Sequence, residues 1–216
     1  MKFALIASLL TLAAGVAQAT PSTTSLAGWA VYGDAVSQGG AITLTTAYLD
    51  GDTDQPFNLS GTSAVDIGTL EAGAGVAPYA LDLSAAEYAT EGSLVQQSFA
   101  VGAGQTLSFT WSFATHETLF EDHAFVVVDG QVFTLATRSA PGAASQGFSY
   151  SFAQGGTASL AFGVVDTVDV LGVSSLSVQN LQVTSVPEPA AAALLLAGLI
   201  GVGGAARRRR ARITAR

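Results

Sequence analysis

Residues 107–113 read LSFTWSF, and this stretch shows most clearly how the chain is built. Leu107, Phe109, Trp111 and Phe113 alternate with serine and threonine. A period of two places the four large side chains on one face of a β-strand. We expect that face to lie in a hydrophobic core, with Trp111 inside it and not on a ligand-binding surface.

The same alternation recurs later in the chain. It is present in residues 148–152 and 160–164, and less regularly at Leu176, Val178, Leu181 and Val183. Residues 123–128 and 131–136 flank Asp129-Gly130, a two-residue signal for a hairpin turn.

The earlier part of the chain adds weaker signals. Strands are expected in residues 28–32, 41–48 and 94–101, and a helical turn or two in residues 81–89. About seven to nine short strands joined by glycine-rich turns are typical of a β-sandwich or a β-barrel, and we favour the sandwich. We therefore predict an all-β fold, a single antiparallel β-sandwich, over residues 20–184.

The first 19 residues have the three parts of an export signal. Lys2 supplies a positive start, residues 3–16 form an apolar stretch, and Ala17-Gln18-Ala19 matches an A-x-A cleavage site. The apolar stretch is too short to cross a bilayer comfortably. We expect residues 1–19 to be a signal peptide that is removed during export across the inner membrane.

The C-terminal segment, residues 185–212, also has three parts. It contains Pro187-Glu188-Pro189, then an uncharged apolar run over residues 190–206, then the arginines Arg207, Arg208, Arg209, Arg210 and Arg212. At ~1.5 Å rise per residue the apolar run reaches ~25 Å, the short end of what crosses a bilayer. Basic residues beside a membrane span stay on the cytoplasmic side. We expect a transmembrane helix over residues 190–206, oriented by this arginine cluster (207–212), which leaves the body outside the cytoplasm.

This three-part ending resembles the PEP-CTERM sorting signal of Gram-negative bacteria. The resemblance implies recognition by an exosortase, a membrane cysteine transpeptidase that is thought to cut near Pro187, Glu188 and Pro189. It implies a transient membrane anchor with a periplasmic body, followed by release or transfer to the cell surface. Proteins with this signal tend to be associated with exopolysaccharide and biofilm.

The body between these two ends is strongly acidic. Fifteen carboxylate side chains lie between residues 20 and 186, and Arg138 is the one lysine or arginine there, so the formal charge is about −14. Such a surface repels nucleic acid and anionic lipid and suits divalent cations. The chain has no cysteine, so export supplies no disulfide bonds.

Residues 91–130 add a second resemblance. A Q-x-F strand, an A-G-x turn and an L-x-F-x-W strand, followed by DHAFVVVDG in residues 122–130, are similar to exported bacterial β-sandwich modules. These modules include jelly-roll, galactose-binding-like and carbohydrate-binding domains. The resemblance implies a fold and assigns no ligand.

Two acidic clusters are candidate calcium sites. Asp50, Asp52 and Asp54 alternate in one loop, and a single loop with this spacing can supply several of the six to eight oxygens that calcium takes. This loop is not an EF-hand, because position 55 is Gln and position 61 is Gly. The second cluster contains Glu117 and Asp122, with Glu121 between them, and Glu91 approaches it if the strands pair as neighbours. The loop with Asp50, Asp52 and Asp54 also fits an ordinary solvated turn.

No catalytic motif is complete. His116-Glu117 starts like a zinc-protease motif, but position 120 is Phe, and His116 and His123 are the only two histidines. There is no G-x-S-x-G nucleophile elbow and no phosphate-binding glycine loop. Paired carboxylates for glycoside hydrolysis cannot be recognised from one sequence.

Aromatic residues near loops and strand ends matter for sugar binding, because rings stack on sugar faces. The candidates are Trp29, Tyr32, Tyr48, Tyr79 and Tyr88. We expect a non-enzymatic surface or extracellular matrix protein associated with exopolysaccharide, with an exosortase and extracellular polysaccharide as partners and no nucleic-acid partner. The alternatives are a secreted glycan-active enzyme of the glycoside hydrolase type and a structural matrix component without a glycan ligand.

Overall fold

The computed structural model describes residues 21–49, 54–142 and 145–185. The predicted signal peptide, the Pro-Glu-Pro element, the apolar run and the arginine cluster all lie outside the described residues. Within the described ranges, no helix is long and apolar enough to cross a membrane.

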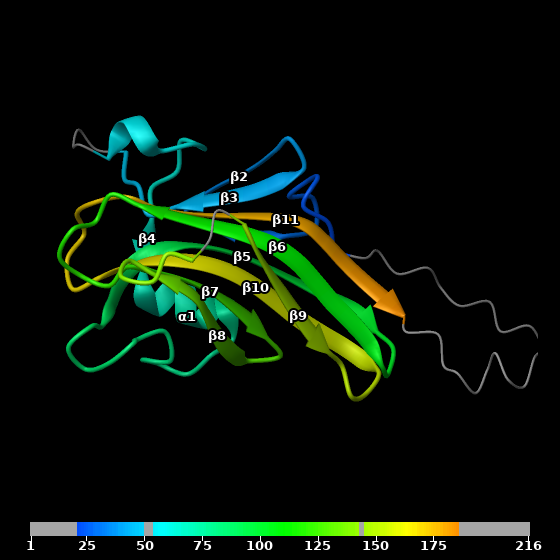
Figure 1. Ribbon diagram of the computed structural model, residues 1–216. Helices are drawn as coiled ribbons and strands as arrows, with labels where there is room; N and C mark the ends of the chain where they lie inside the picture. Colours follow the sequence, from blue (N-terminus) through cyan, green and yellow to red (C-terminus); the bar gives the residue numbers. More distant parts are fainter. Residues whose placement is uncertain (1–20, 50–53, 143–144, 186–216) are drawn as a thin grey trace, which may run out of the picture.

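The body consists of two antiparallel β-sheets packed face to face (Figure 1). The six-stranded sheet runs in the order β1 (Ala30–Tyr32), β5 (Ala89–Val101), β10 (Gly156–Thr167), β7 (His123–Val128) and β8 (Gln131–Thr137), with β4 (Val65–Asp66) also pairing β5. The five-stranded sheet runs in the order β2 (Asp34–Gln38), β3 (Ala41–Thr45), β11 (Ser174–Ser185), β6 (Gln105–Thr115) and β9 (Gln146–Ser151). The all-β sandwich predicted from the sequence is confirmed.

Strand β6 contains the stretch with the clearest alternation. It lies between β11 and β9, and its four large apolar side chains are buried between the sheets. Trp111 is 4% exposed and lies opposite Val178 of β11. The interior position of this ring is confirmed, because the face that it shares with Phe109 and Phe113 is the core face.

Strands β7 and β8 form the predicted hairpin around Asp129-Gly130. Both turn residues have positive φ, 50° for Asp129 and 77° for Gly130. Positive φ at both central positions is the requirement of a type I′ turn, whose twist matches that of the flanking strands.

A bulge in strand β11 explains why its apolar residues, Leu176, Val178, Leu181 and Val183, depart from a strict period of two. The register of β11 with β6 shifts between Gln179 and Gln182, and Asn180 has φ of 54°. Such a bulge inserts extra residues into the strand, so the inward positions continue from Val178 to Leu181 instead of to position 180.

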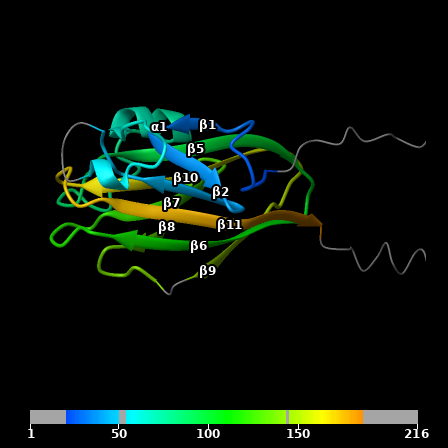
Figure 2. The same cartoon turned by 90° about the horizontal axis from the view of Figure 1, so that it is seen from above.

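The hydrophobic core has two layers. Aromatic rings fill the space between the sheets, with centroids 4.9 Å apart for Phe109 and Phe162 and 5.0 Å for Phe109 and Phe148. A second cluster lies on the outer side of the six-stranded sheet, where Leu70 and Leu81 are buried with Phe125. The helix α1 (Ile67–Ala74) covers this side, away from the five-stranded sheet (Figures 1 and 2).

The helical turn expected in residues 81–89 is wrong. The segment up to Tyr88 is irregular, and the described helices are α1 and a single 3-10 turn, η1 (Gln55–Phe57). The Ser84 hydroxyl accepts hydrogen bonds from the backbone N–H groups of Ala86 (3.2 Å) and Glu87 (3.1 Å). Such local side-chain bonds offer the backbone an alternative to a helix.

Candidate functional site: a tyrosine-lined pocket

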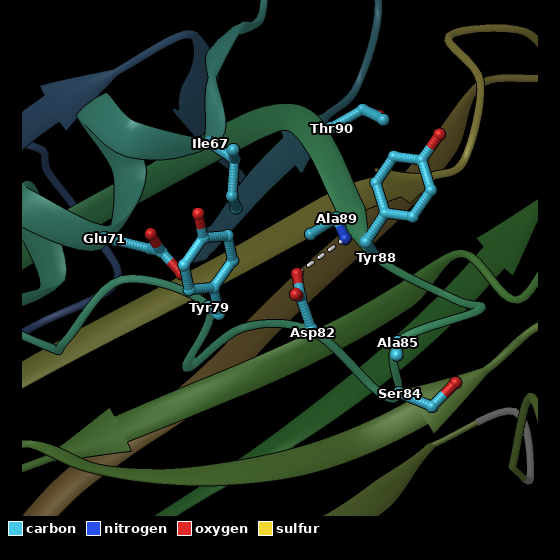
Figure 3. Close-up of a pocket in the computed structure, with 9 residues that line it drawn as sticks. All are labelled: Ile67, Glu71, Tyr79, Asp82, Ser84, Ala85, Tyr88, Ala89 and Thr90. Atoms are coloured by element: carbon cyan, nitrogen blue, oxygen red, sulfur yellow. Dashed lines mark hydrogen bonds between the residues drawn. The ribbon is translucent and has the colours of Figure 1, made fainter.

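A pocket of about 880 Å³ opens on the outer side of the six-stranded sheet, between α1, the segment 75–88 and the start of β5. We refer to it as the Tyr79–Tyr88 pocket (Figure 3). Its lining combines aromatic, acidic and small side chains: Ile67, Glu71, Tyr79, Asp82, Ser84, Ala85, Tyr88, Ala89 and Thr90.

Helix α1 forms one wall of the pocket. Asp66 caps its N-terminus, where its carboxylate accepts hydrogen bonds from Thr69 N (3.1 Å) and Thr69 Oγ1 (2.7 Å). These two bonds lower the pKa of Asp66. The helix ends at Gly75, which has a left-handed φ of 71°. Between these ends the helix buries Leu70 against the sheet and places Glu71 at the pocket.

The segment 75–88 forms the opposite wall. The buried side chain of Leu81 fixes it to the sheet, and Asp82 Oδ1 accepts a hydrogen bond from Ala89 N at 2.9 Å. Tyr79 precedes Leu81 and Asp82 in this segment, and its backbone φ is 68°. The left-handed region costs an L-residue with a large side chain roughly 1–2 kcal/mol. Strain of this kind concentrates at functional sites.

Two tyrosine rings stand at the pocket with much of their surface in solvent. Tyr79 is 81% exposed and Tyr88 is 45% exposed. The Tyr88 hydroxyl donates to Val168 O at 3.4 Å, and Val168 N donates back to Tyr88 O at 2.9 Å. Tyr88 is therefore held at its backbone and at its hydroxyl group while part of its ring stays accessible. An accessible ring can cover the flat apolar face of a ligand.

Two carboxylates line the same pocket. Glu71 is 6% exposed, and its carboxylate points toward the Tyr79 ring in Figure 3. It accepts a long hydrogen bond, 3.5 Å, from Leu81 N. Among the described residues that line the pocket, there is no lysine, arginine or histidine. The pocket can therefore hold a ligand that donates hydrogen bonds and carries no negative charge.

A buried pair of carboxyl groups lies elsewhere, between the sheets. Asp122 accepts hydrogen bonds from Thr167 N (3.0 Å) and Ser174 Oγ (2.7 Å), and its carboxyl group is also hydrogen-bonded to that of Asp166. Burial raises the pKa of Asp122 to about 6. Burial and the neighbouring charge of Asp122 raise the pKa of Asp166 to about 11. The pair therefore holds one proton at neutral pH.

The calcium candidates are only partly described. Asp50 and Asp52 lie outside the described residues, and Asp54 is buried at the start of η1. Within the described ranges, no group of three or more histidine, cysteine, aspartate or glutamate side chains is arranged to hold a metal ion. Calcium binding stays a prediction.

The second acidic cluster is divided among separate partners. Glu117 accepts hydrogen bonds from the backbone N–H groups of Thr118 (2.6 Å) and Phe120 (3.2 Å). Glu121 forms an ion pair with Arg138 at 2.9 Å. Asp122 faces the interior, and Glu91 lies opposite Asp166 in the β5–β10 register and accepts a hydrogen bond from the Tyr48 hydroxyl.

The two histidines lie in different environments. His116 is exposed and its ring lies 4.6 Å from that of Phe57. His123 is 2% exposed, and burial lowers its pKa to about 4, so it is neutral at pH 7. His116 directly follows the last residue of β6, and His123 is the first residue of β7. The two histidines therefore do not lie on one helix, as the zinc-protease motif requires.

The five candidate aromatic residues separate into two groups. Trp29 is buried, and its indole N–H donates to Ser22 O at 3.2 Å. Tyr32 packs over Gly73 of α1, where an added Cβ would lie 2.8 Å from the ring. Tyr48 bonds Glu91. Tyr79 and Tyr88 are the two that reach the pocket.

Sequence reasoning missed Glu71 and Asp82. Glu71 lies in a helix that was not expected, although Asp66 and Gly75 provide a capping signal and a stop signal eight residues of helix apart. Asp82 follows Leu81, and no local pattern distinguishes it from a turn residue.

Comparison with protein-family models found no match to this chain, and comparison with curated proteins found none. Among solved structures, a family 35 carbohydrate-binding module from an environmental isolate is similar to part of it. The identity is 19%, the alignment covers 52% of this chain and 85% of that chain, and the TM-score is 0.26. At these values the likeness carries no argument about function.

Proposed function

We propose that this protein is an exported, non-enzymatic carbohydrate-binding protein that contacts extracellular polysaccharide through the Tyr79–Tyr88 pocket. The observation that carries the proposal is the combination of two accessible tyrosine rings with two carboxylates in one pocket. The C–H face of a sugar ring is apolar and loses contact with water when it stacks on an aromatic ring. The hydroxyl groups at the sugar's edge donate hydrogen bonds to carboxylates.

The proposal includes the cellular route expected from the sequence. The signal peptide (1–19) directs export, and the C-terminal segment anchors the body in the membrane until an exosortase cuts near Pro187 to Pro189. The processed body then reaches the cell surface or the extracellular matrix. The acidic body supports this role, because its charge keeps it apart from nucleic acid and anionic lipid.

The sandwich itself supports the wider resemblance to exported modules. The strands β3-β11-β6-β9 face the strands β5-β10-β7-β8. This order agrees with a jelly-roll-like arrangement, in which two four-stranded sheets form from two Greek keys. The fold alone assigns no ligand.

The alternative is a secreted glycoside hydrolase that uses Glu71 and Asp82. Their presence in one pocket is the observation that favours it, because such enzymes use a pair of carboxylates. Asp82 Oδ1 accepts a hydrogen bond from Ala89 N, which holds this carboxylate at the start of β5. A binding protein leaves the glycan intact, whereas a glycoside hydrolase releases new reducing ends.

The test uses purified full-length protein and a panel of oligosaccharides: neutral, amino-containing and uronic. Isothermal titration calorimetry measures binding, and a reducing-end assay on the same mixtures measures hydrolysis. The proposal expects binding of at least one sugar class without new reducing ends. New reducing ends that disappear in Glu71→Gln would establish the enzyme. Absence of binding to the whole panel would contradict the carbohydrate-binding function.

A further inference from the structure

The carboxylate of Glu71 is the feature of the pocket that narrows the class of sugar. The side chain is 94% buried, since its exposed fraction is 6%, and it lines the open pocket. The hydrogen bond from Leu81 N is long, at 3.5 Å. A carboxylate that lines an open pocket and has one long hydrogen bond can accept further hydrogen bonds from a ligand, and those from a charged donor are the stronger ones.

The described residues provide no cation for Glu71. Within the described ranges, the ion pair is that of Arg138 with Glu121, and Arg138 also donates to Phe120 O at 2.7 Å. Arg138 is also the one lysine or arginine between residues 20 and 186. A ligand that carries a cation can therefore complement Glu71.

The other parts of the pocket also favour a positively charged ligand. Asp82 is a second carboxylate of the lining, and Figure 3 shows it between Tyr79 and Tyr88. Tyrosine rings attract cations to their faces, because the ring quadrupole is negative there. The formal charge of the body, about −14, adds a long-range field of the same sign. Each of these contributions favours a positively charged group and disfavours an anionic sugar.

We propose that the Tyr79–Tyr88 pocket binds an amino sugar with a free ammonium group. Glu71 and Asp82 hold the ammonium, and the rings of Tyr79 and Tyr88 cover the sugar's apolar face. The proposal rests on the carbohydrate-binding function and narrows its ligand to a deacetylated amino sugar within a polysaccharide. Acetylation of the amine removes the charge and leaves the sugar ring unchanged. A comparison of the free and the acetylated amino sugar therefore separates the claim of carbohydrate binding from the claim of a preference for the ammonium group.

The experiment compares two ligands of equal length, the tetramer of glucosamine and the tetramer of N-acetylglucosamine, with the full-length protein at low salt. We expect the glucosamine tetramer to bind at least about tenfold more tightly, because a charge-assisted hydrogen bond is stronger than a neutral one. The preference should shrink at about 1 M salt, where the Debye length falls to ~3 Å. A tetramer of galacturonic acid, tested in parallel, should not bind.

Three variants locate the effect. Glu71→Gln and Asp82→Asn keep the shape of the side chains and remove the charges, so each should reduce the preference for the free amine. Glu87→Gln is the matched control, because Glu87 lies in the same segment, does not line the pocket and accepts a hydrogen bond from Glu121 N at 3.1 Å. It should keep the preference of the unmodified protein.

The outcomes separate the two proposals. Equal affinity for the two tetramers, or tighter binding of the acetylated or uronic one, overturns the amino-sugar proposal and leaves carbohydrate binding in place. A preference that survives both Glu71→Gln and Asp82→Asn overturns the assignment to this pocket. Failure of all three tetramers, together with the neutral sugars of the wider panel, overturns the carbohydrate-binding function as well.

Discussion

The carboxyl groups of Asp122 and Asp166 share a hydrogen bond between the two sheets, and both side chains are almost fully buried. Asp122 precedes β7, and Asp166 lies near the end of β10. Two carboxylates in such contact cannot both be ionised in a site of low polarity, so one proton stays on the pair. This proton makes the stability of the fold depend on pH in a defined direction.

Stability should fall as the pH rises from 7 to 9. The pKa of Asp166 is 3.8 in the unfolded chain and about 11 in the folded one, so across this window the folded state binds the extra proton. Each pH unit then lowers the free energy of unfolding by at most ~1.36 kcal/mol. His123, whose pKa is lowered to about 4, has the opposite effect, but only between about pH 4 and 6.5.

The variant Asp166→Asn tests this assignment. The amide carries no titrating proton, so the decline between pH 7 and 9 should disappear in urea denaturation curves. Asp129→Asn, in the exposed turn of the β7–β8 hairpin, is the control and should keep the decline. Parallel pH profiles for the unmodified protein and Asp166→Asn would show that the buried pair does not hold the proton.

Trp111→Ala should destabilise the fold by roughly 3–5 kcal/mol, because it removes a large buried ring and leaves a cavity. Denaturant unfolding followed by circular dichroism measures the change. Leu119→Ala is the control at a residue that is 72% exposed, and its effect should stay within about 0.5 kcal/mol. A Trp111→Ala protein with unchanged stability would mean that the ring does not support the core.

The strands were predictable where inward and outward positions alternate. In β6 the large residues face the core and serines or threonines face outward, so the period of two is visible in the sequence. In β7 all six residues are buried, because both faces of the six-stranded sheet are covered, and the turn at Asp129-Gly130 provided the clearer signal. The missed helix α1 is short, and the caps Asp66 and Gly75 were its strongest local signals.

The pocket could be predicted only in part. Tyr79 and Tyr88 were among five candidate aromatic residues, but exposure depends on tertiary packing, which also buried Trp29. Glu71 and Asp82 meet in one pocket because Leu81 brings the segment after α1 back onto the sheet. The contact between Asp122 and Asp166 likewise joins strand ends that are far apart in the sequence.

Calcium should raise the melting temperature of the full-length protein if the acidic loop around Asp50, Asp52 and Asp54 binds it. A ligand at a hundredfold excess over its Kd adds about 2.7 kcal/mol to the stability of the native state. The measurement compares melting with calcium and with a chelator at low salt. Equal temperatures contradict the prediction, and a shift that persists in Asp52→Asn and Asp54→Asn places the site elsewhere.

The processed protein should lack both ends of the chain. Proline restricts its own φ and disfavours helix in the residue before it, so Pro187 and Pro189 should keep the chain extended where the exosortase cuts. Intact-mass analysis of protein from native cells should show loss of residues 1–19 and of the segment after about position 186–189. A chain that still ends at Arg216 in cells with active exosortase would contradict the sorting prediction.

The most direct measurement of the central claim is the affinity of the Tyr79→Ala and Tyr88→Ala variants for the sugar that the unmodified protein binds. Removing a stacked ring should weaken binding by at least about tenfold in each variant, because the apolar face of the sugar loses its cover. Tyr79 is 81% exposed, so the melting temperature should change little in Tyr79→Ala; it should fall somewhat more in Tyr88→Ala, because Tyr88 is 45% exposed and its hydroxyl donates to Val168 O. Leu119→Ala should bind like the unmodified protein. Unchanged affinity in both tyrosine variants, with the fold intact, would show that the Tyr79–Tyr88 pocket is not the carbohydrate-binding site.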